Sequence, residues 1–252
     1  MPTHISHGQV KLGKKAPKRL LKSLPLSAYM KSSAVAFPPK IAYERPLTYG
    51  MLANDALGDC TIAAALHMQM VWASVARAGF VPSFVDQDAI SLYSAIGGYV
   101  PGDPNTDQGC VETDVLNYWK STGMKGNQIA GYVTIDVSNL DQLKAAIYIF
   151  GGVYIGIQVP AYIMNVPIGG SWSLMPGADQ SIEGGHAIPV VGYGSQGVTI
   201  ISWGALYTFN YQFWADNCDE AYALVDPLWI KQSGISPSNL DLNGLLADLA
   251  SV

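Results

Sequence analysis

The sequence predicts an α+β fold in which helices and strands occupy separate lobes. Its first half contains segments with helical spacing of apolar residues, and its second half contains short apolar runs rich in β-branched and aromatic residues. With 252 residues, of which 49% are hydrophobic and only 13% charged, the chain can bury a large core. Disorder over most of its length is therefore not expected.

Four helices are expected in the first 150 residues. The clearest lies over residues 61–78, where apolar side chains recur at spacings of three and four and Gly79 follows. The others are predicted over residues 86–94, 112–121 and 140–150. The last of these helices begins beside two capping candidates, Ser138 and Asn139.

The second half of the chain predicts strands. Its apolar runs are mostly bounded by glycine or polar turns, as is typical of short strands. These runs cover residues 152–159, 187–193, 198–203 and 220–225. Because helices come first and strands afterwards, the order favours segregated lobes over alternating βαβ units.

The first 36 residues predict an arm that precedes the compact part of the chain. They contain several prolines and a basic cluster, and Pro38-Pro39 marks the start of the compact domain. That domain is expected over residues 37–230. Residues 231–252 are expected to form a C-terminal extension with a short amphipathic helix near residues 240–249.

The arm is basic, whereas the rest of the chain is acidic. Residues 1–23 contain six basic residues and no acidic one, and the remainder contains eight basic and nineteen acidic residues. The six are Lys11, Lys14, Lys15, Lys18, Arg19 and Lys22. A basic arm on an acidic body predicts contact with an anionic surface. That surface could belong to nucleic acid, to an acidic partner or neighbour in an assembly, or to the body of the chain itself.

No membrane segment or secretion signal is predicted. The longest apolar stretch, residues 145–159, is short and interrupted by glycines, and the N-terminus has no apolar signal core. The three cysteines form no dense paired framework. These features favour a reducing cytoplasm or a virus particle as the location, without a membrane partner.

Cys60 is the strongest nucleophile candidate because it opens the helix predicted over residues 61–78. Backbone N–H groups at a helix start stabilise a thiolate, and so does a nearby imidazolium. His186 lies 126 residues downstream, after a glycine pair and before the apolar run of residues 187–193. This setting suits a general base at the start of a strand. Cys110 and Cys218 are expected to be structural.

These segments resemble the papain family of cysteine peptidases. Residues 54–60 are similar to the family's nucleophile motif, with Asn54 in the place of a glutamine. Residues 184–194 resemble its histidine segment, and Ser202-Trp203-Gly204 matches the end of its Asn-Ser-Trp-Gly motif. Gly109-Cys110 looks like its glycine-containing substrate-binding loop.

The resemblance implies a papain-like two-lobed fold, with a helical N-terminal lobe, an antiparallel β-rich C-terminal lobe and a site in the cleft between them. It implies Cys60, His186 and Asn54 as catalytic residues, and Gly109 and Trp203 as substrate-binding residues. Peptides or proteins would be the substrates, and no cofactor or metal would be needed.

The sequence departs from the family pattern at three positions near the expected site. Ile201 stands where the family has the asparagine that orients the histidine, and its side chain cannot form a hydrogen bond. Ser202 and Asn217 are both candidates for the missing role. Thr61 replaces an aromatic neighbour of the cysteine, and a carboxylate at Asp59 would raise the pKa of the adjacent thiol.

Two functional hypotheses follow. The first is a thiol-dependent hydrolase, a cysteine peptidase that acts through Cys60 and His186. The second is a papain-like module that is weakly active or inactive, a pseudoenzyme that serves as a structural or binding component of an assembly such as a virus particle. The departures at Asp59, Thr61 and Ile201 favour the second hypothesis, and the retained Cys-His pair favours the first.

Motifs for other chemistries are not found in the sequence. His4 and His7 lie close together in the arm, but no further residues supply the ligands of a metal site. Phosphate-binding glycine loops, dinucleotide fingerprints and zinc-ligand spacings do not occur.

Overall fold

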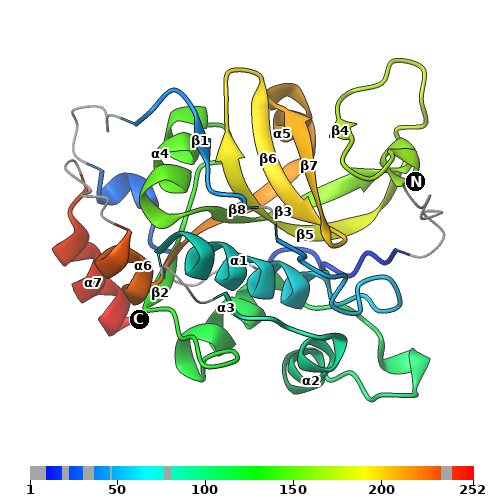
Figure 1. The fold of residues 1–252 in the computed structure, drawn as a ribbon, viewed down its shortest axis with the longest axis horizontal. Helices are drawn as coiled ribbons and strands as arrows, with labels where there is room; N and C mark the ends of the chain where they lie inside the picture. Colours follow the sequence, from blue (N-terminus) through cyan, green and yellow to red (C-terminus); the bar gives the residue numbers. More distant parts are fainter. Residues whose placement is uncertain (1–9, 19–22, 31–36, 46, 77–80, 234–239) are drawn as a thin grey trace.

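A computed structural model describes residues 10–18, 23–30, 37–45, 47–76, 81–233 and 240–252. Three helices form one side of the molecule, namely α1 (Cys60–Ala76), α2 (Asp86–Gly97) and α3 (Glu112–Ser121). A β-sheet forms the other side, and the four helices of the second part flank it: α4 (Leu140–Phe150), α5 (Tyr211–Asn217), α6 (Pro227–Gln232) and α7 (Leu242–Ser251). Figure 1 shows α1 lying directly beneath the sheet, with α2 and α3 beyond it.

The sheet contains eight strands and is almost entirely antiparallel. Seven of them follow the order β2-β8-β3-β5-β6-β7-β4, and β1 pairs with β5. Only the pairing of β4 with β7 is parallel. The strands are β1 (Ile41–Ala42), β2 (Gly131–Thr134), β3 (Val153–Pro160), β4 (Ser171–Trp172), β5 (Ile182–Tyr193), β6 (Gly197–Ser202), β7 (Ala205–Asn210) and β8 (Cys218–Val225). The predicted α+β class with an antiparallel strand-rich lobe is confirmed.

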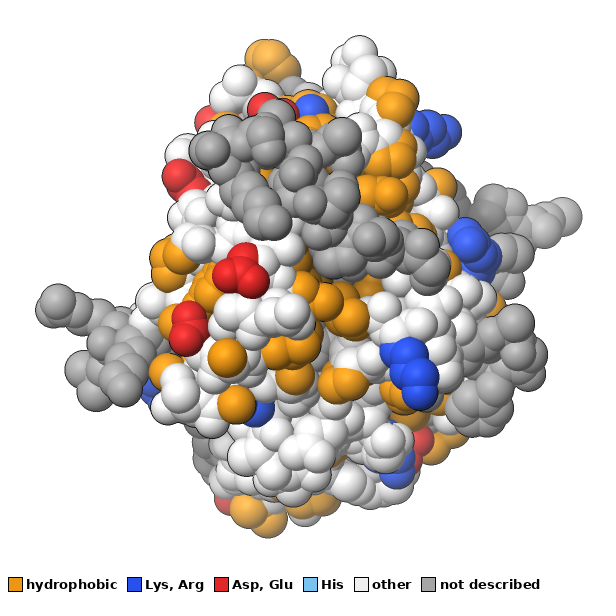
Figure 2. Space-filling view, turned by 90° about the vertical axis from the view of Figure 1, so that its left-hand side faces the viewer, with side chains coloured by type: hydrophobic (Ala, Val, Ile, Leu, Met, Phe, Trp, Pro, Cys, Tyr) orange, Lys and Arg blue, Asp and Glu red, His pale blue; other side chains and the backbone are white. Residues whose placement is uncertain are grey.

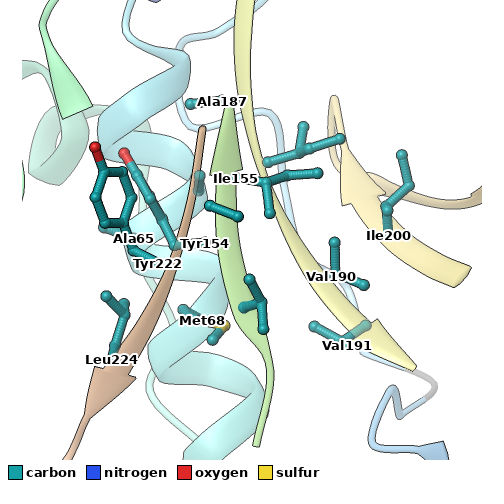
Figure 3. Close-up of a cluster of buried hydrophobic side chains, with 14 of the residues drawn as sticks. Ala65, Met68, Tyr154, Ile155, Ala187, Val190, Val191, Ile200, Tyr222 and Leu224 are labelled. Carbon is teal, nitrogen blue, oxygen red and sulfur yellow. The ribbon is translucent and has the colours of Figure 1, made fainter. Parts of the chain in front are cut away.

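Helix α1 is the centre of the core. Every residue from Cys60 to Ala73 is buried, so the helix is covered on all faces, as its nearly uniform apolar sequence predicts. In Figure 3, Ala65 and Met68 of α1 lie close to the side chains of β3 and β5. The hydroxyl of Tyr154 on β3 also donates to the carbonyl oxygen of Thr61 at 2.8 Å. The start of α1 is thus fixed against the middle of the sheet.

Most predicted elements match the structure. The helices predicted over 112–121 and 140–150 are present with those bounds, and Asn139 caps the latter by accepting a hydrogen bond from the Gln142 N–H. Strand β5 starts five residues earlier than predicted, because the glycine pair before His186 continues the pairing with β3. Six of these helices and strands were not predicted: β1, β2, β4, β7, α5 and α6.

The described part of the arm packs on the rest of the chain. Residues 10–18, dark blue in Figure 1, run between the sheet and the helices below it. Lys14 forms β-bridges to both Cys110 and Gly185, and Leu26 is fully buried. Arg19, Lys22, His4 and His7 lie outside the described residues.

Charged groups are sparse on the face shown in Figure 2, where acidic and basic side chains are scattered among apolar and uncharged ones. No helix in the described ranges is long and apolar enough to cross a membrane.

Candidate functional site

Cys60 occupies the first position of α1, as the sequence predicts, but its thiol is shut off from solvent. The residue is only 1% exposed. Burial raises the pKa of Cys60 to about 12, although hydrogen bonds from the backbone of Ala187 and Gly13 act to lower it. Asp59 and Glu112 raise it further by charge repulsion, in the direction predicted for Asp59. In this arrangement Cys60 is a neutral thiol.

His186 lies on β5, opposite Ile157 of β3, and is also buried. Its Nε2 atom is 2.9 Å from Ser202 Oγ, while its Nδ1 atom has no hydrogen-bond partner among the described residues. Burial lowers the pKa of His186 to about 3. The imidazole is therefore neutral, and Nδ1 is the ring atom that remains free to exchange a proton.

The structure brings Ser202, and not Asn217, to the histidine. Ser202 is the last residue of β6, and the strand register places its hydroxyl beside the His186 ring. Asn217 ends α5, where its amide donates to the Phe213 carbonyl at 3.1 Å. No hydrogen bond between Asn217 and His186 is present in the described parts of the chain. Of the two candidates for the missing asparagine, only Ser202 has the geometry to orient the ring.

Trp203 lies flat against His186. The ring centroids are 4.8 Å apart and the planes differ by 25°. The residue reaches this position through a tight turn between β6 and β7, in which both Trp203 and Gly204 have positive φ, at 45° and 71°. Gly204 also pairs with Gly50, so the turn is held against the segment that leads to α1. Trp203 therefore fixes the imidazole from the side that Ser202 does not contact.

Asn54 is buried at the near end of the cleft and contacts the arm. Its side-chain amide donates to the carbonyl oxygen of Lys11 at 3.2 Å and to that of Leu57 at 3.0 Å. The Lys11 N–H in turn donates to the Asn54 carbonyl at 2.9 Å. The Asn54 amide thus donates both to the arm and to the loop that precedes α1.

The arm is bound by both walls of the cleft. On one wall, the Cys110 N–H donates to the Gly13 carbonyl, and the Lys15 N–H donates to the Cys110 carbonyl, both at 2.9 Å. On the other wall, the Lys14 N–H donates to the carbonyl of Gly185 at 3.0 Å. Residues 11–15 thus contact the segments that hold Asn54, Cys60, Gly109 and His186. These four segments therefore lie around a peptide of the same chain, and the His186 Nδ1 atom forms no hydrogen bond to Cys60 in the described part of the chain.

Glycines allow the arm to approach this closely. A Cβ atom at Gly13 would overlap the carbonyl oxygen of Gly58, and one at Gly109 would overlap the carbonyl oxygen of Gly13. Gly109 also has a φ of 72°, which glycine adopts without strain. The backbone at Gly109 therefore lies directly against the backbone of Gly13.

Two described lysines of the arm pair with acidic side chains of the body. Lys14 Nζ lies 2.9 Å from both Asp219 Oδ2 and Glu220 Oε1, and Lys18 Nζ forms an exposed pair with Asp114 at 2.6 Å. The body of the chain, one of the three anionic surfaces expected for the arm, is thus contacted by Lys14 and Lys18.

All three cysteines are free and buried. Within the described ranges, no group of three or more His, Cys, Asp or Glu side chains could hold a metal ion.

Solved structures with the same fold are cysteine proteases. Xylellain, a cysteine protease from Xylella fastidiosa, is 16% identical, with a TM-score of 0.66, over 86% of this chain and 97% of that protein. A digestive procathepsin L2 proteinase from the larval midgut of Tenebrio molitor is 14% identical, with a TM-score of 0.61, over 87% of this chain and 79% of that protein. Procathepsin B S9 from Trypanosoma congolense is 11% identical, with a TM-score of 0.59, over 88% of both chains. The chain therefore has the papain-like two-lobed fold.

The sequence by itself matches no family model and no curated protein. None of the three structures described above is named as a component of a virus particle.

The buried neutral His186 predicts a pH dependence of stability. Its pKa is about 3 in the folded chain against about 6.5 in an unfolded one, so its contribution is complete above pH 6.5 and is lost as the pH falls towards 3. Between pH 7.5 and 5 the chain should lose up to about 2 kcal/mol of unfolding free energy from this group. Over the same pH range, the His186→Gln variant should lose about 2 kcal/mol less unfolding free energy than the wild type. Urea unfolding at each pH measures both losses.

Comparison with the variant is needed because burial also raises the pKa values of Asp59 and Glu112. These two groups make the folded chain more stable as the pH falls, which opposes the effect of His186. Their contribution is the same in both chains and cancels. Equal losses in the two chains would show that His186 is not held neutral by burial.

Proposed function

We propose that this chain is a papain-type cysteine peptidase whose own N-terminal arm keeps it latent. The observation that carries the proposal is the path of residues 11–15. They hydrogen-bond to both walls of the cleft, as an extended peptide substrate would, and they cover Cys60. The substrates proposed are peptides or proteins. The solved structures with this fold give no support to the hypothesis of a non-catalytic module, which rests on the departures at Asp59, Thr61 and Ile201 alone.

The seated arm is not itself in position to be cut. The group of Gly13 that hydrogen-bonds the Cys60 sulfur is its backbone N–H, whereas attack requires a carbonyl carbon next to the sulfur. The arm also runs parallel to the segment at Cys110, as the Lys14–Cys110 bridge shows. An inhibitor of this kind uses the binding groups of the cleft without presenting a scissile bond to the nucleophile.

Once the arm leaves, the residues of the site can carry out acyl transfer. The Cys60 thiol would give its proton to His186 Nδ1, and the sulfur would attack the substrate carbonyl. Asn54 Nδ2 and the Cys60 N–H would stabilise the oxyanion. His186 would then return the proton to the leaving amine, and water would hydrolyse the thioester by the same steps in reverse. Ser202 would hold the imidazole in place through Nε2.

The first prediction concerns release of the arm. Gly13→Ala places a Cβ atom into the carbonyl oxygen of Gly58, so the arm cannot keep its position. We expect a small alkylating reagent at pH 7.5 to modify Cys60 at least about tenfold faster in this variant than in the wild type, because solvent access lowers the thiol pKa towards its usual value. Mass spectrometry of the modified peptides over time measures each cysteine separately.

Gly194→Ala is the matched control for this experiment. It makes the same substitution at a glycine whose Cβ atom would meet nothing within 4 Å, so its Cys60 should react as in the wild type. Cys218 is the internal reference, since it is buried and its backbone forms none of the hydrogen bonds to residues 11–15 described above. If Gly13→Ala left the reactivity of Cys60 unchanged, the arm would not be what shields it.

A second prediction separates the two candidates for the third catalytic position. In the Gly13→Ala background, Ser202→Ala should lower kcat on a denatured, fluorescently labelled protein substrate by about ten- to a hundredfold, with KM nearly unchanged, because only the orientation of His186 is lost. Asn217→Ala should have little effect. Cys60→Ala should abolish cleavage.

Measured pH profiles give an independent readout of the positioning role. Loss of the Ser202 hydroxyl should shift the limb of the kcat profile that reports His186, whereas a general weakening of the fold would lower activity at all pH values alike. Equal losses for Ser202→Ala and Asn217→Ala would contradict the assignment.

A further inference from the structure

The side chain of Lys14 enters a pocket that the predicted catalytic residues do not explain. Its ammonium group is fully buried and lies 2.9 Å from both Asp219 Oδ2 and Glu220 Oε1. Burial lowers the pKa of Lys14, but Glu112, Glu220 and Asp219 outweigh burial, so that the pKa is raised. Three carboxylates from two separate elements, α3 and β8, therefore surround one cation.

The pocket is built to hold these carboxylates in fixed positions. Tyr222 donates its hydroxyl proton to Glu220 Oε2 at 2.7 Å, and Gln158 donates to Asp219 Oδ2 at 2.6 Å. Gly156 of β3 forms the floor beneath the lysine stem, since a Cβ atom there would overlap the Lys14 side chain. Specificity sites generally have such supporting hydrogen bonds behind the groups that contact the ligand.

Glu112 adds a third acidic group to the pocket, and burial raises its pKa while Lys14 acts to lower it. It is fully buried at the start of α3, and neither of its carboxylate oxygens has a hydrogen-bond partner among the described residues. Lys14 attracts its negative charge, while Glu220 and Asp219 repel it. Removal of Lys14 would leave the buried Glu220, the buried Glu112 and the more exposed Asp219 close together without a counter-charge, which is unfavourable.

We propose that this pocket, once the arm has left, selects peptide substrates with a lysine or arginine side chain next to the bond that is cut. The inference rests on the proposed peptidase function and adds the substrate class. Lys14 directly follows Gly13, whose N–H contacts the Cys60 sulfur, so the pocket lies within one or two residues of the nucleophile along a bound chain. The arm's own lysine occupies the place of the substrate's basic residue.

The test uses the full chain with Gly13→Ala and a set of fluorogenic peptide amides. The two residues before the cleaved amide are varied in turn among lysine, arginine, leucine, glutamate and norleucine, the last of which matches the lysine stem without its charge. At one of these positions, kcat/KM for lysine or arginine should exceed that for norleucine by about tenfold or more.

Isosteric changes in the pocket should reduce this ratio. Glu220→Gln and Asp219→Asn each remove one charge with little change in shape, and the lysine-to-norleucine ratio should fall at least about fivefold in each. Asp216→Asn is the control, since it neutralises an exposed carboxylate of the neighbouring helix α5 and should leave the ratio unchanged. A preference for leucine or norleucine, unaffected by Glu220→Gln, would overturn the inference while leaving the peptidase function intact.

If no cleavage is observed at all, the peptidase function and the pocket must be tested separately, the latter by peptide binding. If no peptide and no denatured protein is cleaved, the proposed peptidase function fails. The pocket is then tested with the doubly substituted chain Gly13→Ala, Cys60→Ala and a labelled peptide of residues 10–18, with lysine or norleucine at position 14, by fluorescence anisotropy. At least about tenfold weaker binding of the norleucine peptide supports the basic-residue pocket, and equal binding overturns it.

Discussion

The passage of residues 11–15 between the two lobes is the constraint on which the arrangement of the cleft depends. Three backbone hydrogen bonds, to Cys110 and Gly185, hold this peptide across the cleft. The glycines at 13 and 109 let its backbone approach the walls, and the buried Lys14 anchors it by charge. The backbone of Gly13 also contacts the Cys60 sulfur, so this segment lies directly against the proposed nucleophile.

Burial explains why the cysteine and histidine are not a charged pair in this state. The thiol pKa is raised to about 12 and the imidazole pKa is lowered to about 3, so both groups are neutral and the proton stays on sulfur. A thiolate–imidazolium pair needs either solvent or mutual contact, and the arm prevents the first. In this account latency is an electrostatic consequence of where the arm lies, in addition to steric exclusion of substrate.

Much of this arrangement could be predicted from single segments of the sequence, because local signals specify it. The polar cap at Asn139 and the apolar spacing of α1 defined helices, and Cys60 and His186 stood out through their helix-start and glycine-pair settings. Ser202 and Asn217 could not be separated, because the difference lies in the register of β6 and the turn at Trp203. The acidic pocket could not be predicted because Glu112 is far in the sequence from Asp219 and Glu220. Taken singly, each of these acidic residues is typical of a protein surface. The position of the arm was missed as well, although Gly13 between a leucine and two lysines was a signal of close backbone contact.

The most direct test of the account is an experimental structure of the Gly13→Ala chain after reaction with a peptidyl vinyl sulfone that carries lysine at each of the two residues before the reactive group. The account predicts a covalent bond to the Cys60 sulfur, His186 still contacting Ser202, and a lysine of the inhibitor between Asp219 and Glu220 with the arm displaced. An unmodified Cys60, or a modified Cys60 with the inhibitor's lysines outside the acidic pocket, would contradict it.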